Sequence, residues 1–157
     1  MKIICDTREK KDYFTFATYD DVEVISYKLK TGDYSIEGYE NKITIDRKRT
    51  SGEFYINLGS SSKRVKKEMD RMVEFDHAYF VMSFPESDLL TFPKNSGIPY
   101  KRWKYLKMGA PALRKTFYEI REQYPSIEFI FCDDNYEAEK TTYNLLKEYY
   151  DKQNNKN

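Results

Sequence analysis

Two aspartates and a lysine lie in a short stretch that is expected to fold as a β-hairpin. Residues 31–49 read TGDYSIEGYENKITIDRKR, in which two segments of alternating pattern flank the turn-prone residues 38–41. Closing the hairpin with this loop places Asp33 opposite Asp46, with Lys48 on the same face. The other face is apolar. The hairpin therefore separates an apolar side from a side with two carboxylates and an amine.

Two facing aspartates favour a divalent cation between them. Directly opposed side chains in an antiparallel pair have β-carbons about 4.5–5.5 Å apart, so their carboxylates repel unless a cation intervenes. Mg²⁺ takes carboxylate oxygens at about 2.0–2.1 Å and keeps several waters, one of which can become a nucleophile. Lys48 would orient that water or offset charge on a phosphate. An exposed hairpin face with ordinary charges explains the spacing equally well.

A third carboxylate and a guanidinium precede the hairpin. Residues 2–9, KIICDTRE, begin with an apolar run typical of a buried strand. They end with Asp6 and Arg8, which share a face under strict alternation. The guanidinium geometry matches that of a phosphate. These residues favour phosphodiester chemistry over an exposed hairpin face with ordinary charges.

Three short motifs resemble the XPF family of structure-selective DNA endonucleases. They are D-x-R-E at Asp6 to Glu9, G-D at Gly32 and Asp33, and D-R-K at Asp46 to Lys48. The family carries V-D-x-R-E, then G-D, then E-R-K, in the same order and at similar spacing. The resemblance covers most of the chain, and its specificity lies in the first fifty residues. It implies an α/β fold with a restriction-endonuclease-like core, in which helices flank a mixed central β-sheet.

The resemblance also implies roles for individual residues. Asp33 and Asp46 would bind Mg²⁺ or Mn²⁺ together with the main-chain carbonyl of Arg47. Lys48 would be the catalytic lysine. In the first motif, Asp6 would support a second metal position, and Arg8 would contact the scissile phosphate.

Two departures from the family pattern concern the acids. Asp46 stands where the family has glutamate, which retracts the carboxylate by about 1.5 Å, roughly one carbon–carbon bond. Either acid occurs at this position in the wider restriction-endonuclease-like superfamily. The family also has an aspartate four residues beyond the lysine, where this chain has Gly52 followed by Glu53. A shift of one residue would let Glu53 substitute.

Basic residues are concentrated beside these motifs. The net charge is only +1, yet residues 42–67 contain eight bases against two acids, and residues 94–107 contain bases and no acids. The compensating acids gather in residues 119–139. This segregation predicts a basic face that binds DNA phosphates, with a solvated lysine-rich face as the alternative. The expected DNA contacts around the motifs are Arg8, Arg47, Arg49, Lys63, Arg64, Lys66 and Lys67.

Aromatic and basic residues alternate in residues 100–107, YKRWKYLK. Such a mixture stacks on unpaired bases while neutralising phosphates, here through Lys101, Arg102 and Lys104. Anchoring of the loop on the core by Trp103 and Tyr105, or a dimer contact through them, explains the pattern equally well. The preceding residues 93–99 contain two prolines and a glycine and predict a loop, which would form a mobile flap over the site.

The remaining pattern predicts one nuclease domain over residues 1–150 and a disordered polar tail over 151–157. Strands are expected at 22–29, 78–84 and 127–132. Helices are expected at 61–75 with an N-cap at 60–62, after Pro111, and after Asn135. Their apolar stripes are Val65, Met69, Met72 and Val73; Leu113, Phe117, Ile120 and Tyr124; and Ala138, Thr142, Leu145 and Tyr149.

The composition excludes several other chemistries. Two cysteines in separate apolar runs do not frame a zinc site and are expected to pack in the core, and a single histidine excludes nucleases that need several. No apolar stretch is long enough for a membrane span, which predicts a cytoplasmic protein. Abundant lysine, asparagine, tyrosine and isoleucine are typical of an A·T-rich bacterial or phage genome.

The sequence therefore predicts a Mg²⁺- or Mn²⁺-dependent DNA endonuclease that cuts branched or flapped DNA in repair or recombination. A junction resolvase or an exonuclease on the same core is an alternative. A DNA-binding pseudonuclease is an alternative of another class, against which the intact Asp33, Asp46 and Lys48 argue. The family resemblance implies dimerisation, here as a homodimer.

Overall fold

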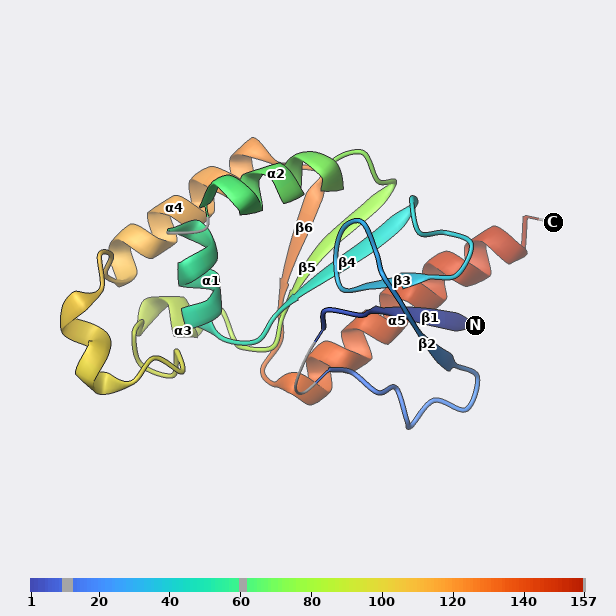
Figure 1. The fold of residues 1–157 in the computed structure, drawn as a ribbon, viewed down its shortest axis with the longest axis horizontal. Coiled ribbons are helices and arrows are strands. Elements are labelled where there is room, and N and C mark those ends of the chain that lie inside the picture. Colours follow the sequence, from blue (N-terminus) through green and yellow to red (C-terminus); the bar gives the residue numbers. More distant parts are fainter. Residues whose placement is uncertain (10–12, 60–61, 157) are drawn as a thin grey trace.

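A computed structural model describes residues 1–9, 13–59 and 62–156 and contains one six-stranded mixed sheet between helices (Figure 1). The sheet order is β2-β1-β3-β4-β5-β6, in which β3 is antiparallel to both neighbours and the other pairs are parallel. The predicted fold class is therefore confirmed. The strands are β1 Lys2–Asp6, β2 Glu23–Tyr27, β3 Tyr34–Ile36, β4 Ile43–Lys48, β5 His77–Met82 and β6 Ile127–Phe131. The helices are α1 Ser51–Leu58, α2 Ser62–Met72, α3 Ser87–Leu90, the 3₁₀ helix η1 Tyr100–Tyr105, α4 Ala110–Gln123 and α5 Asn135–Asn154.

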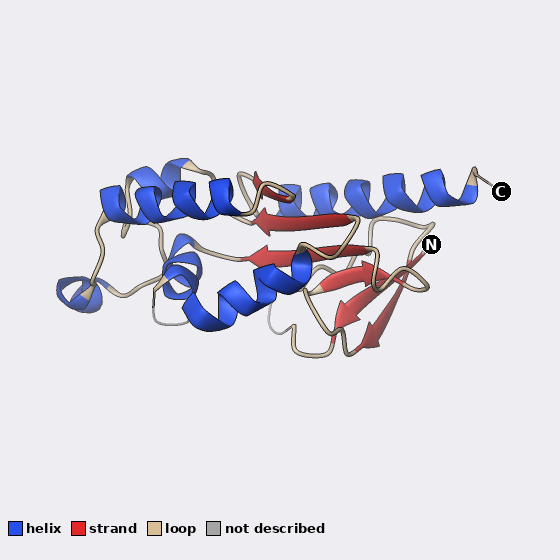
Figure 2. Cartoon of the chain, turned by 90° about the horizontal axis from the view of Figure 1, so that it is seen from above, coloured by secondary structure: helices blue, strands red, loops and turns tan. Residues whose placement is uncertain are grey.

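Different helices cover the two faces of the sheet. Helices α1, α2 and α4 pack on the face that receives Phe80 and Met82 of β5, whereas α5 packs on the face that receives Val81. Burial on both faces explains why β5 reads as a nearly continuous apolar run. Both termini lie at one end of the molecule and η1 at the other (Figures 1 and 2).

The hairpin has the predicted register but a longer loop. Tyr34 pairs with Ile45, which is the register that places Asp33 opposite Asp46. The ladder ends at Ile36 and resumes at Ile43, so the connection exceeds the expected four residues. Neither face of the hairpin is open to solvent, since every residue of β3 and β4 is buried. Its two edges are covered by β1 and β5.

Gly32 allows the backbone just before Asp33 to lie close to β4. Its φ is +79°, and a β-carbon there would collide with Thr44 Oγ1. Only glycine combines this left-handed conformation with such a close approach. The amide N–H of Asp33 then donates to the Ile45 carbonyl at 2.8 Å. The glycine of the G-D motif therefore fixes the backbone from which the Asp33 side chain projects.

Helix α1, which had no counterpart in the sequence prediction, begins shortly after the D-R-K motif. Thr50 is its N-cap, and the hydroxyl accepts a hydrogen bond from the Glu53 amide at 3.1 Å. A β-carbon at Gly52 would collide with the Ser96 carbonyl, to which the Gly52 amide donates at 3.2 Å. The loop before η1 is thus packed on the start of α1 rather than free over the site.

Three of the predicted helices occur, with corrections to their details. Helix α2 ends at Met72, and Val73 is 42% exposed, so Val73 does not belong to the buried stripe. Of the N-cap residues proposed for it, 60 and 61 lie outside the described residues. The stripe of α4 is confirmed at its buried members Leu113 and Phe117. In α5, Leu146 is buried rather than the expected Leu145.

The C-terminal residues are helical, where the sequence predicted a disordered tail from Asp151. Helix α5 continues to Asn154. Buried Tyr149 anchors the last turns against the sheet, and Asp151 accepts a hydrogen bond from Lys147 at 2.8 Å. Tertiary packing of one helical face outweighs the polar composition of the segment.

Both cysteines are buried, as predicted, and His77 is exposed at the start of β5. Within the described ranges, no helix is long and apolar enough to cross a membrane.

Candidate active site

The predicted catalytic residues converge on the sheet face beneath α1 and α2. A pocket of about 450 Å³ opens there. Asp46 is not among the lining residues, but it contacts Lys48, which is. The pocket is lined by Asp6, Arg8, Lys30, Thr31, Gly32, Asp33, Lys48, Glu53, Ile56, Asn57, Arg64, Glu68 and Arg71.

Lys48 and Asp46 form a buried ion pair. Lys48 Nζ lies 2.6 Å from Asp46 Oδ1, and the two side chains are 7% and 6% exposed. Within the described part of the chain, Oδ1 has no partner other than this ammonium. Burial opposes the charge on Lys48, but the adjacent Asp46 carboxylate outweighs it, so the pKa of Lys48 is raised. The lysine is therefore held as a cation at the site.

Asp33 lies among like charges. Its carboxylate accepts a hydrogen bond from the Arg47 amide at 2.8 Å. Burial raises the pKa of Asp33 well above its ordinary value, and the charges of Asp46 and Glu9 raise it further. Such crowding of carboxylates costs free energy that a bound cation would offset.

Asp6 is saturated with hydrogen bonds. Its two oxygens accept from the Arg8 amide at 2.9 Å, from Arg8 Nε at 2.8 Å and Nη2 at 3.2 Å, and from the Leu29 amide at 2.7 Å. Burial alone would raise the pKa of Asp6, but the hydrogen bonds from Arg8 lower it overall. In this arrangement Asp6 serves as an anchor for the Arg8 guanidinium, which also donates to the Leu29 carbonyl at 2.7 Å.

Glu9, the last residue of the D-x-R-E motif, was missed as a candidate acid. Its side chain is 5% exposed, and Oε1 pairs with Arg49 Nη2 at 3.3 Å. Oε2 is buried and has no partner among the residues that the structure describes. Its charge acts on Asp33. The signal was present in the sequence, because Glu9 is part of the motif, but strict alternation with Asp6 and Arg8 pointed to the other face.

Glu68 of α2 was also missed. Its carboxyl lies within hydrogen-bonding reach of Asp46, and burial together with the Asp46 charge raises the pKa of Glu68 to about 8. Arg64, Glu68 and Arg71 line the pocket from one face of α2. The spacing of these three residues was readable from the sequence, but which face of the helix meets the site was not.

The donor set suits a hard divalent cation. Mg²⁺ binds through one or two carboxylates and keeps several waters, and the two carboxylates available here are Asp33 and Asp46, the second of which is paired with Lys48. Within the described residues, no three acidic, histidine or cysteine side chains are gathered in a ligating arrangement. The residues fit a cation held by few protein oxygens.

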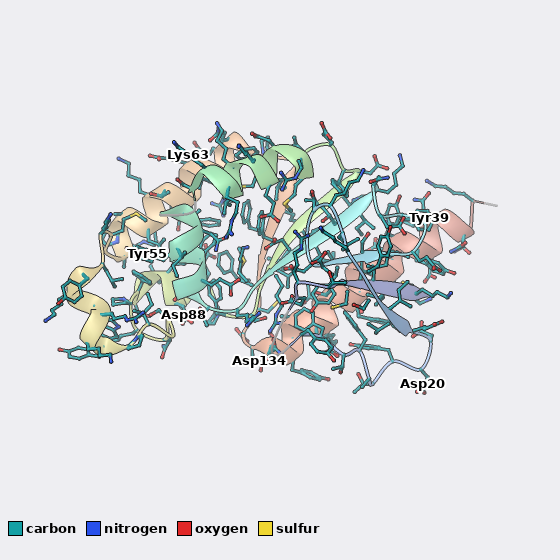
Figure 3. All side chains as sticks on the ribbon, viewed as in Figure 1. Asp20, Tyr39, Tyr55, Lys63, Asp88 and Asp134 are labelled. Atoms are coloured by element: carbon teal, nitrogen blue, oxygen red, sulfur yellow. The ribbon has the colours of Figure 1, made fainter. Side chains whose placement is uncertain are left out.

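The predicted DNA-contacting bases do not all face the pocket. Arg8 and Arg64 line it, joined by the unpredicted Lys30 and Arg71. Lys63, marked in Figure 3, and Lys67 are exposed on α2, whereas Lys66 lines a separate crevice between α2 and α4.

Arg47 is a correction to the predicted DNA contacts. It is 4% exposed and lies on the opposite face of the sheet. Its guanidinium stacks over the Phe14 ring, 4.5 Å from the centroid, and donates to Ser83 Oγ at 3.3 Å. Strand alternation explains the difference, because Asp46 and Lys48 point to one face and Arg47 to the other.

In η1 one aromatic side chain is anchored by a hydrogen bond, whereas the other aromatic and the basic side chains are exposed. Trp103 is anchored, since Nε1 donates to the Ile98 carbonyl at 2.9 Å. Tyr100 and Tyr105 are 80% and 73% exposed, and the bases predicted there, Lys101, Arg102 and Lys104, are exposed as well. In Figure 1, η1 lies beyond α1 and α3 at the end of the molecule, so it does not cover the pocket as a flap.

Comparison with solved structures identifies the fold. A structure described as XPF from Aeropyrum pernix matches 94% of this chain and 60% of its own chain, with a TM-score of 0.64 and 18% sequence identity. A second, described as XPF from Aeropyrum pernix in complex with DNA, matches 96% of this chain and 65% of its own, with a TM-score of 0.65 and 17% identity. This chain thus spans less than two thirds of either match. No model of a known family and no curated protein matches the sequence.

Proposed function

We propose that this protein is a divalent-metal-dependent DNA endonuclease that hydrolyses backbone phosphodiesters in branched or flapped DNA. The observation that carries the proposal is that Asp33 and Lys48 line one pocket together with arginines, and that Lys48 is paired with Asp46. An XPF-like fold supports it, as does the DNA complex of one structural match. Repair or recombination is the setting in which such DNA arises.

The proposed roles follow from the contacts of each side chain. Asp33, Asp46 and the Arg47 carbonyl would hold Mg²⁺ or Mn²⁺, which supplies a Lewis acid for the phosphate and lowers the pKa of water. Lys48, already held as a cation, would stabilise negative charge that develops on the phosphate. Arg8, oriented by Asp6, has a side chain that is 60% exposed, and its guanidinium would bind a phosphate oxygen.

The proposed DNA path combines the pocket rim with the outer surface of α2 and with η1. Exposed Lys63, Arg64 and Lys67 on α2 would contact backbone phosphates, and Arg49 would do so from the edge of the site. The exposed rings of η1 would stack on unpaired bases at a fork or flap. Lys66, Lys101, Arg102 and Lys104 would add phosphate contacts. We propose a homodimer as the working form, to be measured by analytical ultracentrifugation.

The decisive experiment is cleavage of a labelled panel of forks, flaps, four-way junctions and free-ended duplexes with Mg²⁺ and with Mn²⁺. Asp33→Asn and Asp46→Asn are expected to abolish cutting, because each removes a charged ligand while keeping the side-chain shape. Asp20→Asn, at the exposed position marked in Figure 3, is the matched control and should cut like the wild type. Undiminished cutting by either site variant would refute the site assignment.

The same panel separates the alternatives. Selective, symmetric cutting of four-way junctions would indicate a resolvase, and digestion from free ends would indicate an exonuclease. DNA binding without metal-dependent cutting of any substrate would indicate a pseudonuclease.

A further inference from the structure

A phenylalanine ring lies behind the candidate active site, on the opposite face of the sheet. Phe14 belongs to the loop between β1 and β2 and is fully buried. Its ring stacks on the Tyr34 ring with 5.2 Å between the centroids, and the guanidinium carbon of Arg47 lies 4.5 Å from the centroid of Phe14. The Phe14 amide also donates a hydrogen bond to Tyr34 Oη at 2.9 Å. One ring therefore joins a side chain of β3 to a side chain of β4.

Both partners of this ring directly follow a carboxylate of the site. Tyr34 follows Asp33, and Arg47 follows Asp46. Successive side chains of a strand point to opposite faces, so contacts on one face affect where the carboxylates lie on the other. The backbone continues the link, because the Arg47 amide donates to Asp33 Oδ2 at 2.8 Å. The two strands are thus joined on both faces of the sheet at the level of the site.

The strand ladder gives little support to this region. Within the described chain, the paired residues of β3 and β4 are Tyr34 and Ile45, whereas β4 pairs with β5 over its full length. Arg47 lies two residues beyond the pair with β3. Side-chain contacts must therefore fix the spacing between Asp33 and Arg47.

The far end of the Arg47 side chain is attached to two other elements. Nε donates to Ser83 Oγ, which directly follows β5, and Nη2 donates to Asn135 Oδ1 at the start of α5. These hydrogen bonds fix the plane of the guanidinium, and a planar guanidinium stacks well on an aromatic face. The Phe14 ring therefore lies against a group that is itself held in place. Lysine at this position would keep the charge but would lose the flat surface.

We propose that Phe14 is a positioning residue, which holds Asp33 and Arg47 in the geometry that phosphodiester hydrolysis needs. This inference rests on the proposed function, since it assumes that the reaction takes place at the pocket with Asp33 and Lys48. The ring lies outside the pocket lining and acts through Tyr34 and Arg47. A shift of about 1 Å at a reacting group can slow a reaction by about a hundredfold. Loss of the ring should therefore slow the chemical step more than it weakens DNA binding.

The first test is the kinetics of DNA cleavage with Mg²⁺ by the full chain, on the substrate of the panel that the wild type cuts best. Phe14→Leu keeps an apolar side chain but removes the ring, and we expect kcat to fall by about ten- to a hundredfold with an unchanged KM for DNA. Phe117→Leu is the matched control, because Phe117 is equally buried but packs in the core on the other face of the sheet. The control should lose stability and retain the kcat of the wild type.

The second test is hydrogen exchange of the Arg47 amide in the free protein, which reports the positioning without any catalysis. The exchange rate is divided by that of the Val81 amide, because Val81 is fully buried in β5 and reports opening of the core. In Phe14→Leu this ratio should rise by about tenfold, which corresponds to the loss of one aromatic contact. In Phe117→Leu the ratio should stay at the wild-type value.

Arg47→Lys tests the same contact from its other side. It should also lower kcat at an unchanged KM, and combining it with Phe14→Leu should add little, because both substitutions remove one interaction. Fully additive losses of kcat would contradict the inference. If Phe14→Leu does not fold, Arg47→Lys alone decides: a wild-type kcat and a wild-type exchange ratio would then overturn the inference.

The outcomes separate this inference from the proposed function. An unchanged exchange ratio in Phe14→Leu, or an equal loss of kcat in Phe117→Leu, would overturn the inference and leave the nuclease assignment standing. A wild type that cuts no DNA would overturn the proposed function. A raised exchange ratio in Phe14→Leu would still show in that case that the ring holds the Arg47 amide.

Discussion

Glu68 makes the stability of the metal-free protein depend on pH in an unusual direction. Burial and the neighbouring Asp46 raise its pKa from 4.5 to about 8 in the folded chain. The folded state therefore retains a proton that the unfolded state releases. The stability contributed by this group is fully present below about pH 4.5 and is lost as the pH rises through about 8.

The size of the effect follows from the shift. A rise from 4.5 to about 8 is about 3.5 pH units, and each unit corresponds to about 1.4 kcal/mol, so the upper limit is about 5 kcal/mol. Between pH 5 and 7 the difference approaches one proton, which gives a loss of about 2–3 kcal/mol. Glu68→Gln removes this titration. The variant should therefore become progressively more stable than the wild type as the pH rises.

Urea unfolding in EDTA at pH 5, 6, 7 and 8 measures this difference directly. Comparing variant with wild type at each pH cancels the titration of all other groups that the substitution leaves unchanged. Glu74→Gln should run parallel to the wild type across the range, since its side chain is exposed. A gap between Glu68→Gln and the wild type that stays constant from pH 5 to 7 would refute the reasoning.

Two further predictions concern the buried ion pair and the exposed rings. Lys48→Met should lower the free energy of unfolding by about 3–5 kcal/mol, because it strands a buried carboxylate that is only 6% exposed; an unchanged urea midpoint would contradict this. Replacing both Tyr100 and Tyr105 with alanine should weaken binding of single-stranded DNA by about 1–3 kcal/mol per stacked base without altering the melting temperature, as both rings are largely exposed. Fluorescence anisotropy with single-stranded and duplex oligonucleotides measures it, and an equal loss for duplex would argue against stacking.

The hairpin illustrates how much local pattern can predict. Alternation in residues 31–49 was sufficient to derive the pairing of Tyr34 with Ile45, and that pairing is confirmed. The register is determined by side-chain polarity, since a slip of one residue would move every apolar side chain to the opposite face. The same alternation assigns Arg47 to the face away from Lys48. Its contact with DNA was predicted from charge alone, and the buried position corrects that prediction.

The helical segments show where pattern is insufficient. The polar composition after Asp151 predicted disorder, but helix α5 continues because Tyr149 packs into the core. The helix α1 is short and was not predicted, and its start depends on the cap at Thr50 and the close packing of Gly52 against the Ser96 carbonyl. Such contacts join residues that are far apart in the sequence, so local periodicity carries no signal for them.

The sequence by itself determined which residues are candidates for the site, namely the carboxylates of Asp33 and Asp46 and the amine of Lys48. It also determined the strand register that brings them to one face. Residue type and the two-residue period of a strand suffice for that. Only the tertiary structure decided that Asp6 is saturated by Arg8, that Glu9 approaches Asp33, and that Glu68 reaches Asp46. These outcomes depend on how a helix lies over a sheet and how a chain turns after a strand. Both are set by packing across the whole core, not by neighbouring residues.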